Sequence, residues 1–228
     1  MEEYPNEEHL VKILGVKNVT HNVKQFTLDK PGNYTFTPGQ ATDIVINQPK
    51  WKEERRPFTF TCLNNLNTLE FTIKIYDDHE GVTNQLGKLK AGDELIVHDV
   101  YGAIQYKGEG YFIAGGAGVT PFIAILRDLN QNGKLGNNQL IFSNKTTKDI
   151  ILKDEFEKML GNNFINTLTE ENTDKYDHGQ IDENYLAKNI KDFEKYFYIC
   201  GPDPMIEAIR TDLLKLGVKE DKIVVEEF

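Results

Sequence analysis

Two stretches of the sequence place glycine and proline directly after a short run of aromatic and β-branched residues. The first is YFIAGGAGVTPF, residues 111–122, and the second is YFYICGPDPM, residues 196–205. Each run is typical of a buried strand, and the glycine after it lets the chain turn sharply and lets a ligand approach the backbone. Unpaired N–H groups at such a turn attract anions, phosphates in particular. Tight packing at a turn without any ligand is the alternative explanation.

The first stretch has several residue types that suit a phosphate-binding turn. Gly115, Gly116 and Gly118 allow a pyrophosphate to come close to the backbone. Thr120 is predicted to cap the following helix, and Pro121 fits its first turn. A glycine-rich turn between a strand and a helix is by itself a weak indication of a nucleotide site.

The second stretch strengthens that indication. If both strands belong to one parallel sheet, their carboxyl ends lie where ligands bind in such sheets, and one molecule could span both ends. Cys200, at the end of the second strand, is either a buried structural thiol or a polarisable contact for a flat ring.

A third stretch, RRPFTFT (residues 55–61), combines a cation, an aromatic ring and a hydroxyl. Along a strand, Arg56 and Phe58 face one side and Thr59 the other. Arginine suits a phosphate, phenylalanine offers an apolar face, and threonine offers a hydrogen bond. A surface arginine beside two core residues is the plainer interpretation.

Composition places the chain among globular proteins and argues against several partners. Of its 228 residues, 39% are hydrophobic and 27% are charged, and the formal net charge of −10 disfavours nucleic acid and anionic membrane surfaces. The acidic N-terminus does not resemble a secretory signal, and the uncharged stretch 111–126 is too short and too polar to span a bilayer. We therefore expect a cytoplasmic protein, with its oligomeric state open.

Metal chemistry is not expected. The two cysteines, Cys62 and Cys200, lie far apart, and the five histidines are scattered without ligand spacing. The sequence thus predicts no metal site and no [2Fe–2S] centre of its own, because such a centre needs four ligands.

The first half of the chain has the pattern of an antiparallel β-barrel. Turn sequences such as KPGN, TPGQ and NNLN separate short runs rich in Val, Ile, Thr and Phe. The predicted strands are 11–19, 23–29, 41–47, 56–63, 69–76 and 94–100. One short helix is predicted over 81–89, with Thr83 near its start.

The second half alternates strands with helices, which is typical of a parallel sheet covered on both faces. The predicted strands are 111–115, 139–143, 164–169, 196–200 and 222–228. The predicted helices are 121–129, 152–160, 182–190 and 204–217. We predict a two-domain protein: an antiparallel β-barrel over residues 1–105 and an α/β nucleotide-binding domain over 106–228.

Taken together, these motifs resemble the ferredoxin–NADP reductase superfamily along essentially the whole chain. TPGQ is similar to a turn of the family's barrel, RPFT to its Arg-x-Tyr-Ser/Thr flavin motif, and GVTNQL to the segment that holds flavin phosphates. GGAGVTPF matches the family's pyridine-nucleotide turn, and CGPDPM its Cys-Gly-Pro motif. The resemblance implies a flavin-binding barrel joined to an NAD(P)-binding domain.

The resemblance implies flavin contacts from two parts of the barrel. In the flavin motif, Arg56 would pair with a phosphate, Phe58 (next to Pro57) would pack beside the ring or the ribityl chain, and the Thr59 hydroxyl would reach flavin N5. Phe58 stands where the family commonly has tyrosine, so a contact through a phenolic hydroxyl is absent. The remaining implied contacts are Lys74, Ile75, Gly81, Val82 and Thr83.

The resemblance also implies the nucleotide contacts and the catalytic residues. The pyrophosphate and ribose would be held by Gly115, Gly116, Gly118, Val119, Thr120 and Pro121, and the nicotinamide by Cys200, Gly201, Pro202, Asp203 and Met205. The chain's end, VVEEF, would place Glu226 near the hydride path and Phe228 on the flavin face, although Phe228 also suits the core of a last strand. Thr59, Cys200 and Glu226 are the candidate catalytic residues.

For the cofactors, the family implies FAD rather than FMN, with NADH or NADPH as co-substrate. Family members that prefer NADPH hold its 2′-phosphate with a serine–arginine pair, and Glu170 of the segment LTEEN stands in that place here. A carboxylate repels a phosphate and accepts a ribose hydroxyl, which favours NADH, whereas the nearby Lys145 opposes this conclusion.

The implied activity is an oxidoreductase that passes electrons to a separate acceptor: a ferredoxin, a flavodoxin, a haem protein or a small oxidant. The basic stretch KWKEERR (50–56) is a candidate docking patch, but its mixed charge also suits a solvated loop. Two other functions remain open: a flavin- or nucleotide-binding regulatory module without hydride transfer, and an electron-transfer subunit that turns over only when docked to another protein.

Overall fold

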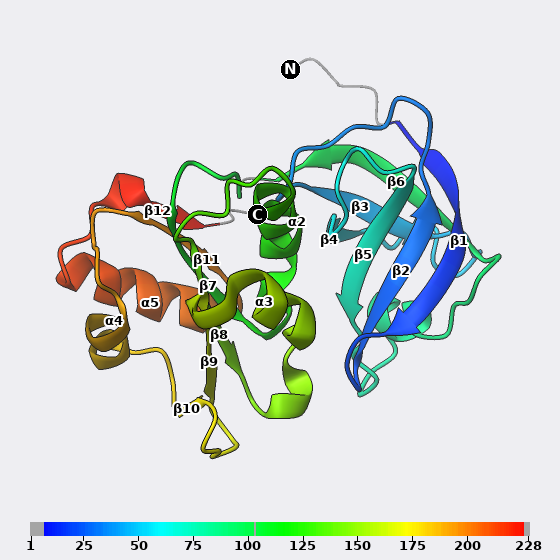
Figure 1. Ribbon diagram of the computed structural model, residues 1–228. Coiled ribbons are helices and arrows are strands. Elements are labelled where there is room, and N and C mark those ends of the chain that lie inside the picture. The colour runs from blue at the N-terminus through cyan, green and yellow to red at the C-terminus, as the bar shows by residue number, and fades with distance from the viewer. Residues whose placement is uncertain (1–6, 103, 226–228) are drawn as a thin grey trace.

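The computed structural model describes residues 7–102 and 104–225, and the strands within these ranges form two six-stranded sheets (Figure 1). The first sheet is antiparallel, with the strand order β4-β3-β6-β1-β2-β5. Its strands are β1 (His9–Asn18), β2 (Val23–Asp29), β3 (Ala41–Ile46), β4 (Arg56–Thr59), β5 (Thr68–Lys74) and β6 (Glu94–Tyr101).

The chain that follows β4 closes this sheet into a barrel. Phe60 bridges Phe71 of β5, and the Thr61 N–H donates to the Glu70 carbonyl at 2.9 Å. The single strand predicted over 56–63 is therefore divided, because its first half pairs with β3 and the residues after it pair with β5. The antiparallel barrel predicted from the sequence is confirmed.

Aromatic residues fill the barrel interior. Phe26, Phe60 and Phe71 are fully buried there, and the Phe36 ring stacks on Phe60 with centroids 4.1 Å apart. The TPGQ turn leads into β3, and its glycine is required: Gly39 has φ +96°, and a Cβ there would lie 2.0 Å from the Ile104 carbonyl oxygen.

The second sheet is parallel, with the strand order β10-β9-β8-β7-β11-β12. Its strands are β7 (Gly110–Gly115), β8 (Gln139–Asn144), β9 (Phe164–Leu168), β10 (Asp177–His178), β11 (Tyr196–Cys200) and β12 (Ile223–Val225). From β7 the chain builds outward through β8 and β9, then returns to place β11 on the other side of β7. This reversal creates a topological switch point, where sheets of this class bind ligands.

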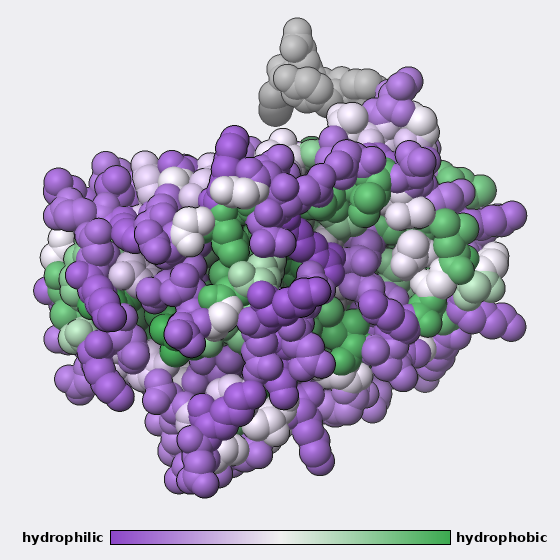
Figure 2. All heavy atoms as spheres, in the orientation of Figure 1, coloured by the Kyte–Doolittle hydropathy of each residue, from purple (hydrophilic) through white to green (hydrophobic). Residues whose placement is uncertain are grey.

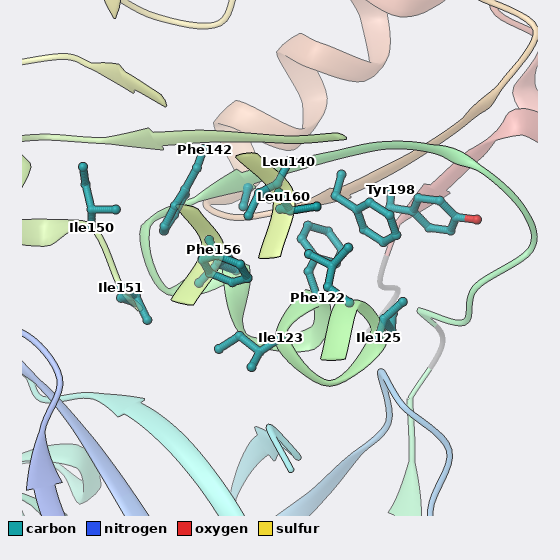
Figure 3. Close-up of a cluster of buried hydrophobic side chains, with 14 of the residues drawn as sticks. Phe122, Ile123, Ile125, Leu140, Phe142, Ile150, Ile151, Phe156, Leu160 and Tyr198 are labelled. Atoms are coloured by element: carbon teal, nitrogen blue, oxygen red, sulfur yellow. The ribbon is translucent and has the colours of Figure 1, made fainter. Parts of the chain in front are cut away.

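The helices cover both faces of the parallel sheet, as predicted. The helices around the sheet are α2 (Thr120–Gln131), α3 (Lys153–Leu160), α4 (Glu183–Asn189) and α5 (Asp203–Lys215), and the short helix α1 (Val82–Leu86) lies in the barrel. Because successive strand residues face opposite sides, Phe112 lies in one core with α2 and α3, while Ile113 lies in a second core with α4 and α5. Figure 3 shows the first core, with Phe122 and Phe142 among its side chains.

The barrel contacts the face of the sheet that α2 covers. Val23 of β2 and Ile104 of the connecting segment belong to the same hydrophobic core as α2, and Figure 1 shows α2 between the parallel sheet and the barrel. Hydrophilic residues cover most of the face drawn in Figure 2. Of the helices in residues 7–102 and 104–225, none is long and apolar enough to cross a membrane.

Two further local features differ from the sequence predictions. Thr120 is not a helix cap: the preceding turn, Gly116–Val119, is already helical, so α2 continues from it and the Thr120 hydroxyl donates to the Ala117 carbonyl at 3.0 Å. Pro121 does occupy the first turn of α2. The two-residue strand β10 was not predicted from the sequence.

Candidate functional site

The two glycine-terminated strands belong to one parallel sheet, as predicted, and lie side by side in it. β7 and β11 are neighbours in the parallel sheet, with Cys200 in register with Ala114. A Cβ built on Gly201 would lie 3.2 Å from the backbone of Gly115, so the two strand ends pack backbone against backbone. They therefore form one continuous surface on which a ligand could lie.

Packing explains two of the glycines in the first turn. A Cβ on Gly118 would lie 2.3 Å from the Cys200 carbonyl oxygen, and one on Gly115 would lie 2.5 Å from the Met205 sulfur. Gly116 differs, because no atom lies within 4 Å of its Cβ position and its φ of +52° is a left-handed conformation that glycine adopts readily. Close packing and an open backbone surface thus occur in the same turn.

A cavity of about 520 Å³ lies over these strand ends and extends to the barrel. Of the predicted site residues, it brings together Lys74, Gly115, Gly116, Gly118, Gly201, Pro202 and Met205. Its other lining residues are Asn22, Val23, Tyr76, Ala117, Ser143, Asn144, Lys145, Asp149, Ile151 and Thr169. Both domains therefore build the same cavity.

Asn144 is the cavity residue that most clearly indicates a polar ligand. It is 5% exposed, and neither its amide oxygen nor its amide nitrogen has a hydrogen-bond partner among the described residues. Burying an unpartnered amide is costly, which makes a ligand or an ordered water the natural partner. Sequence reasoning missed Asn144, although it ends the strand next to β7 and the same strand-end argument applies to it.

Lys145 and Glu170, whose charges have opposite consequences for NADPH, form an ion pair. The Lys145 Nζ lies 2.9 Å from the Glu170 Oε1, and both side chains are more than half exposed. The hydrogen bond and the charge of Glu170 raise the pKa of Lys145 above its ordinary value. Lys145 lines the cavity, whereas Glu170 is not one of its lining residues.

The predicted flavin strand, β4, is an outer strand of the barrel sheet. Within the described ranges, β4 pairs with β3, and the link to β5 consists of the Phe60–Phe71 bridge and the Thr61–Glu70 hydrogen bond beyond the end of β4. Thr59 is 9% exposed, and its hydroxyl makes no hydrogen bond to a described residue. The outer edge of β4 thus has no ladder partner among the described residues, and the flavin contacts of this strand stay a prediction.

The other flavin residues predicted in β4 contact neighbouring protein side chains. The Arg56 guanidinium is half exposed and lies 3.0 Å from Glu54, and Phe58 packs against the barrel core. Arg55 pairs with Glu8 at 3.4 Å, and Lys50 with Glu80 at 3.5 Å. Each of these basic residues of stretch 50–56 thus has an acidic neighbour, which favours the solvated-loop interpretation over a basic docking patch.

The remaining predicted residues are placed as follows. Ile75 follows β5 and donates its N–H to the Asn22 carbonyl, and Gly81 precedes α1, in which Val82 is buried and Thr83 is half buried. Val119 is buried directly before α2, and Pro121 is buried in its first turn. Cys200 is half buried at the end of β11, and Asp203 begins α5. Pro57 lies in β4, and Glu226 and Phe228 lie outside the described residues.

Two domain families match the chain. Residues 11–106 match the oxidoreductase FAD-binding domain, and residues 112–211 match the oxidoreductase NAD-binding domain. Groups of three or more metal-ligating side chains are absent from residues 7–102 and 104–225.

Curated relatives match nearly the full chain. The reductase component of propane 2-monooxygenase from Mycolicibacterium goodii is 26% identical over 98% of this chain and 68% of that protein. The corresponding component from Rhodococcus jostii is 25% identical over 98% of this chain and 64% of that protein. NADH-cytochrome b5 reductase 1 from Homo sapiens is 24% identical over 95% of this chain and 84% of that protein. The chain thus spans about two thirds of the length of the monooxygenase reductase components.

Solved structures share the fold. The FAD/NAD-binding domain of nitric oxide dioxygenase from Vibrio cholerae superimposes with a TM-score of 0.85 at 22% identity, covering 96% of this chain and 98% of that one. A ferredoxin NADP+ reductase from Neisseria gonorrhoeae, with bound FAD and NADP, gives a TM-score of 0.83 at 20% identity, covering 96% and 97%.

Proposed function

The chain belongs to the ferredoxin–NADP reductase superfamily, and on that premise we propose that it moves electrons from NADH or NADPH through FAD to a separate acceptor. The observation that carries this proposal is the cavity in which Lys74 of the barrel meets the Gly115–Gly118 turn and the end of β11. A dinucleotide on the strand ends would there lie next to Lys74 at the end of β5.

The residues of the chain supply position and polarity for this reaction. Bound FAD would supply the redox chemistry that links a hydride donor to an electron acceptor. Thr59 donates a hydrogen bond at the ring edge, Arg56 exchanges its pairing with Glu54 for a flavin phosphate, and Asn144 provides the buried amide that holds the dinucleotide. The roles of Gly81, Val82 and Thr83 at the phosphates, and of Cys200, Glu226 and Phe228 near the reacting rings, remain predictions from the family.

The deciding experiment is an absorption spectrum of the purified protein before and after anaerobic addition of NADH. We expect a yellow protein whose visible flavin absorbance is bleached by NADH, because a nicotinamide stacked with roughly 3–3.5 Å between the reacting atoms is placed for hydride transfer. Protein that remains colourless after incubation with FAD and FMN would contradict the proposal. A yellow protein that NADH and NADPH both fail to bleach would indicate a regulatory flavin-binding module.

We further propose that NADH is the preferred co-substrate, because a 2′-phosphate would have to displace Glu170 from Lys145 and remain near its carboxylate. Glu170→Gln is expected to raise kcat/KM for NADPH by about fivefold, which corresponds to the roughly 1 kcal/mol that an exposed ion pair contributes, and to change the value for NADH little. The measurement is steady-state turnover with each nucleotide and ferricyanide as acceptor.

A matched control for that substitution is Glu194→Gln, which removes a similarly exposed carboxylate that lies 4.0 Å from Lys219. It should leave the ratio of the two kcat/KM values unchanged. A wild-type preference for NADPH, or an unchanged ratio in Glu170→Gln, would overturn the proposed preference.

A protein acceptor completes the proposal, with a ferredoxin, a flavodoxin or a haem protein as the candidates. It is supported by relatives whose names describe a reductase component of a monooxygenase and reductases of cytochrome b5. The test is to add each candidate, oxidised, to the NADH-reduced protein and to follow the return of the flavin absorbance. We also propose a domain boundary at 105/106 and a cytoplasmic location, which limited proteolysis and cell fractionation would test.

A further inference from the structure

One arginine outside the cavity donates four hydrogen bonds, two within its own domain and two to the barrel. Arg127 lies in α2, and its Nε and NH2 groups donate to the two carboxylate oxygens of Glu155 in α3 at 2.5 and 2.8 Å. Its NH1 group donates to two atoms of the barrel, the Thr61 carbonyl oxygen at 2.5 Å and the Glu70 Oε1 at 2.7 Å. The planar fork of a guanidinium suits such divided contacts, whereas a lysine ammonium cannot reproduce their geometry.

The barrel partners of Arg127, Thr61 and Glu70, lie where the chain after the flavin strand β4 pairs with β5 and closes the barrel. Thr61 lies two residues beyond Thr59, and its N–H donates to the Glu70 carbonyl. The Thr61 hydroxyl also donates to the Glu70 Oε1 at 2.8 Å, the oxygen that accepts from Arg127. Arg127 therefore contacts the chain directly after the end of β4, two residues beyond Thr59.

On the other side, Arg127 is joined to the nucleotide turn through a single rigid helix. α2 begins at Thr120, directly after the Gly116–Val119 turn, and Arg127 lies about two helical turns further along. Between these points α2 is buried by Phe122, Ile123 and neighbouring residues, so it cannot shift without the sheet beneath it. The Arg127 contacts thus connect the two halves of the proposed reaction site.

The surroundings of Arg127 favour a role in orientation over one in simple packing. The side chains of Arg127 and Glu70 are each 20% exposed. Burial lowers the pKa of the Arg127 guanidinium, but the hydrogen bonds and charges of Glu155 and Glu70 outweigh it and raise the pKa above its ordinary value, so the charge is permanent. A second cavity, of about 630 Å³, opens beside the arginine between the domains. Apolar packing is therefore incomplete where these hydrogen bonds are made.

We propose that Arg127 is a positioning residue for hydride transfer, setting the distance and angle between a nicotinamide held on the β7 and β11 ends and a flavin held beside β4. The inference rests on the proposed function. Arg127 touches neither ligand; it fixes the barrel's flavin strand relative to the nucleotide turn. Because a misplacement of about 1 Å at reacting atoms can cost around 100-fold in rate, loss of this link acts on the hydride step far more than on binding.

The test compares Arg127→Met with Lys195→Met, a control that removes a similarly buried cation of the same domain, paired with Glu109. In anaerobic stopped-flow reduction, Arg127→Met is expected to lower the limiting rate at saturating NADH by at least about 20-fold, while the dissociation constants of FAD and NADH change less than about threefold. Lys195→Met should change none of these. Scanning calorimetry gives an independent readout: Arg127→Met should separate the unfolding of the two domains into two transitions, and Lys195→Met should not.

A second variant separates orientation from charge. Arg127→Lys keeps the charge near Glu70 and Glu155 and should recover most of the thermal stability, yet it should remain at least about fivefold slower than the wild type, because an ammonium cannot reproduce the fork. A wild-type rate in Arg127→Met, or full recovery of the rate in Arg127→Lys, would overturn the proposal. If Arg127→Met does not fold, Arg127→Lys decides alone. Wild-type protein that NADH does not reduce contradicts the proposed function instead, and calorimetry still reports on the link between the domains.

Discussion

Replacement of Gly118 by alanine is expected to lower kcat/KM for NADH by at least about 100-fold, because the added Cβ displaces the nucleotide turn. That Cβ would lie 2.3 Å from the Cys200 carbonyl oxygen and 2.6 Å from the Gly201 Cα, and both are backbone atoms that cannot rotate away. The turn and the end of β11 must therefore separate, which breaks the continuous surface on which the dinucleotide would lie. Overpacking of this kind also destabilises a protein by about 1–3 kcal/mol.

The measurement is NADH titration and stopped-flow reduction, together with the flavin content of the purified variant. Flavin content should remain at the wild-type level, since the change lies in the parallel sheet. Gly32→Ala is the matched control, because no atom lies within 4 Å of the Cβ position at Gly32. Normal NADH kinetics in Gly118→Ala would show that the turn does not carry the nucleotide.

Replacement of Thr59 by valine is expected to leave FAD bound and to slow flavin reduction by at least tenfold, since removing one preorganised hydrogen-bond donor costs about 2–4 kcal/mol in comparable sites. The substitution keeps the shape of the side chain. It should disturb folding little, because the Thr59 hydroxyl has no partner among the described residues. The readout is the limiting rate of anaerobic reduction by NADH.

Thr27→Val provides the control for Thr59→Val, since it makes the same chemical change in β2, away from the predicted flavin residues. It should reduce at the wild-type rate. An unchanged rate in Thr59→Val would exclude the proposed hydrogen bond to the flavin and leave the threonine with a packing role.

The fold could be predicted from the sequence because its signals are local. β2 and β11 have the predicted bounds, and β7 and β11 belong to one parallel sheet as predicted, although the sequence did not reveal that they are neighbours. The strand through 56–63 was predicted too long, because strand propensity does not reveal that a chain changes pairing partner after Thr59. Likewise, the Thr-Pro pair at 120–121 suggested a cap, but the helical turn before it leaves no extended residue at the cap position.

The candidate site was predicted only in part, because some of its features depend on distance between segments. For Gly115 and Gly118 the sequence left ligand approach and tight packing as alternatives, and only the structure shows the atoms that a side chain would meet at each position. Lys145 and Glu170 were weighed as opposing charges, and their ion pair becomes visible only when β8 and β9 are side by side. Arg127 carries no motif, since its partners lie far away in the chain.

The two outer strands of the barrel sheet have a consequence for the apoprotein. β4 and β5 are joined only beyond the end of β4, so the β4 edge keeps backbone donors and acceptors that a ligand is expected to satisfy. An edge of that kind is also a template for a strand from another molecule. Loading with cofactor would then protect the chain from self-association, and conditions that strip the cofactor would make it prone to aggregate through this edge.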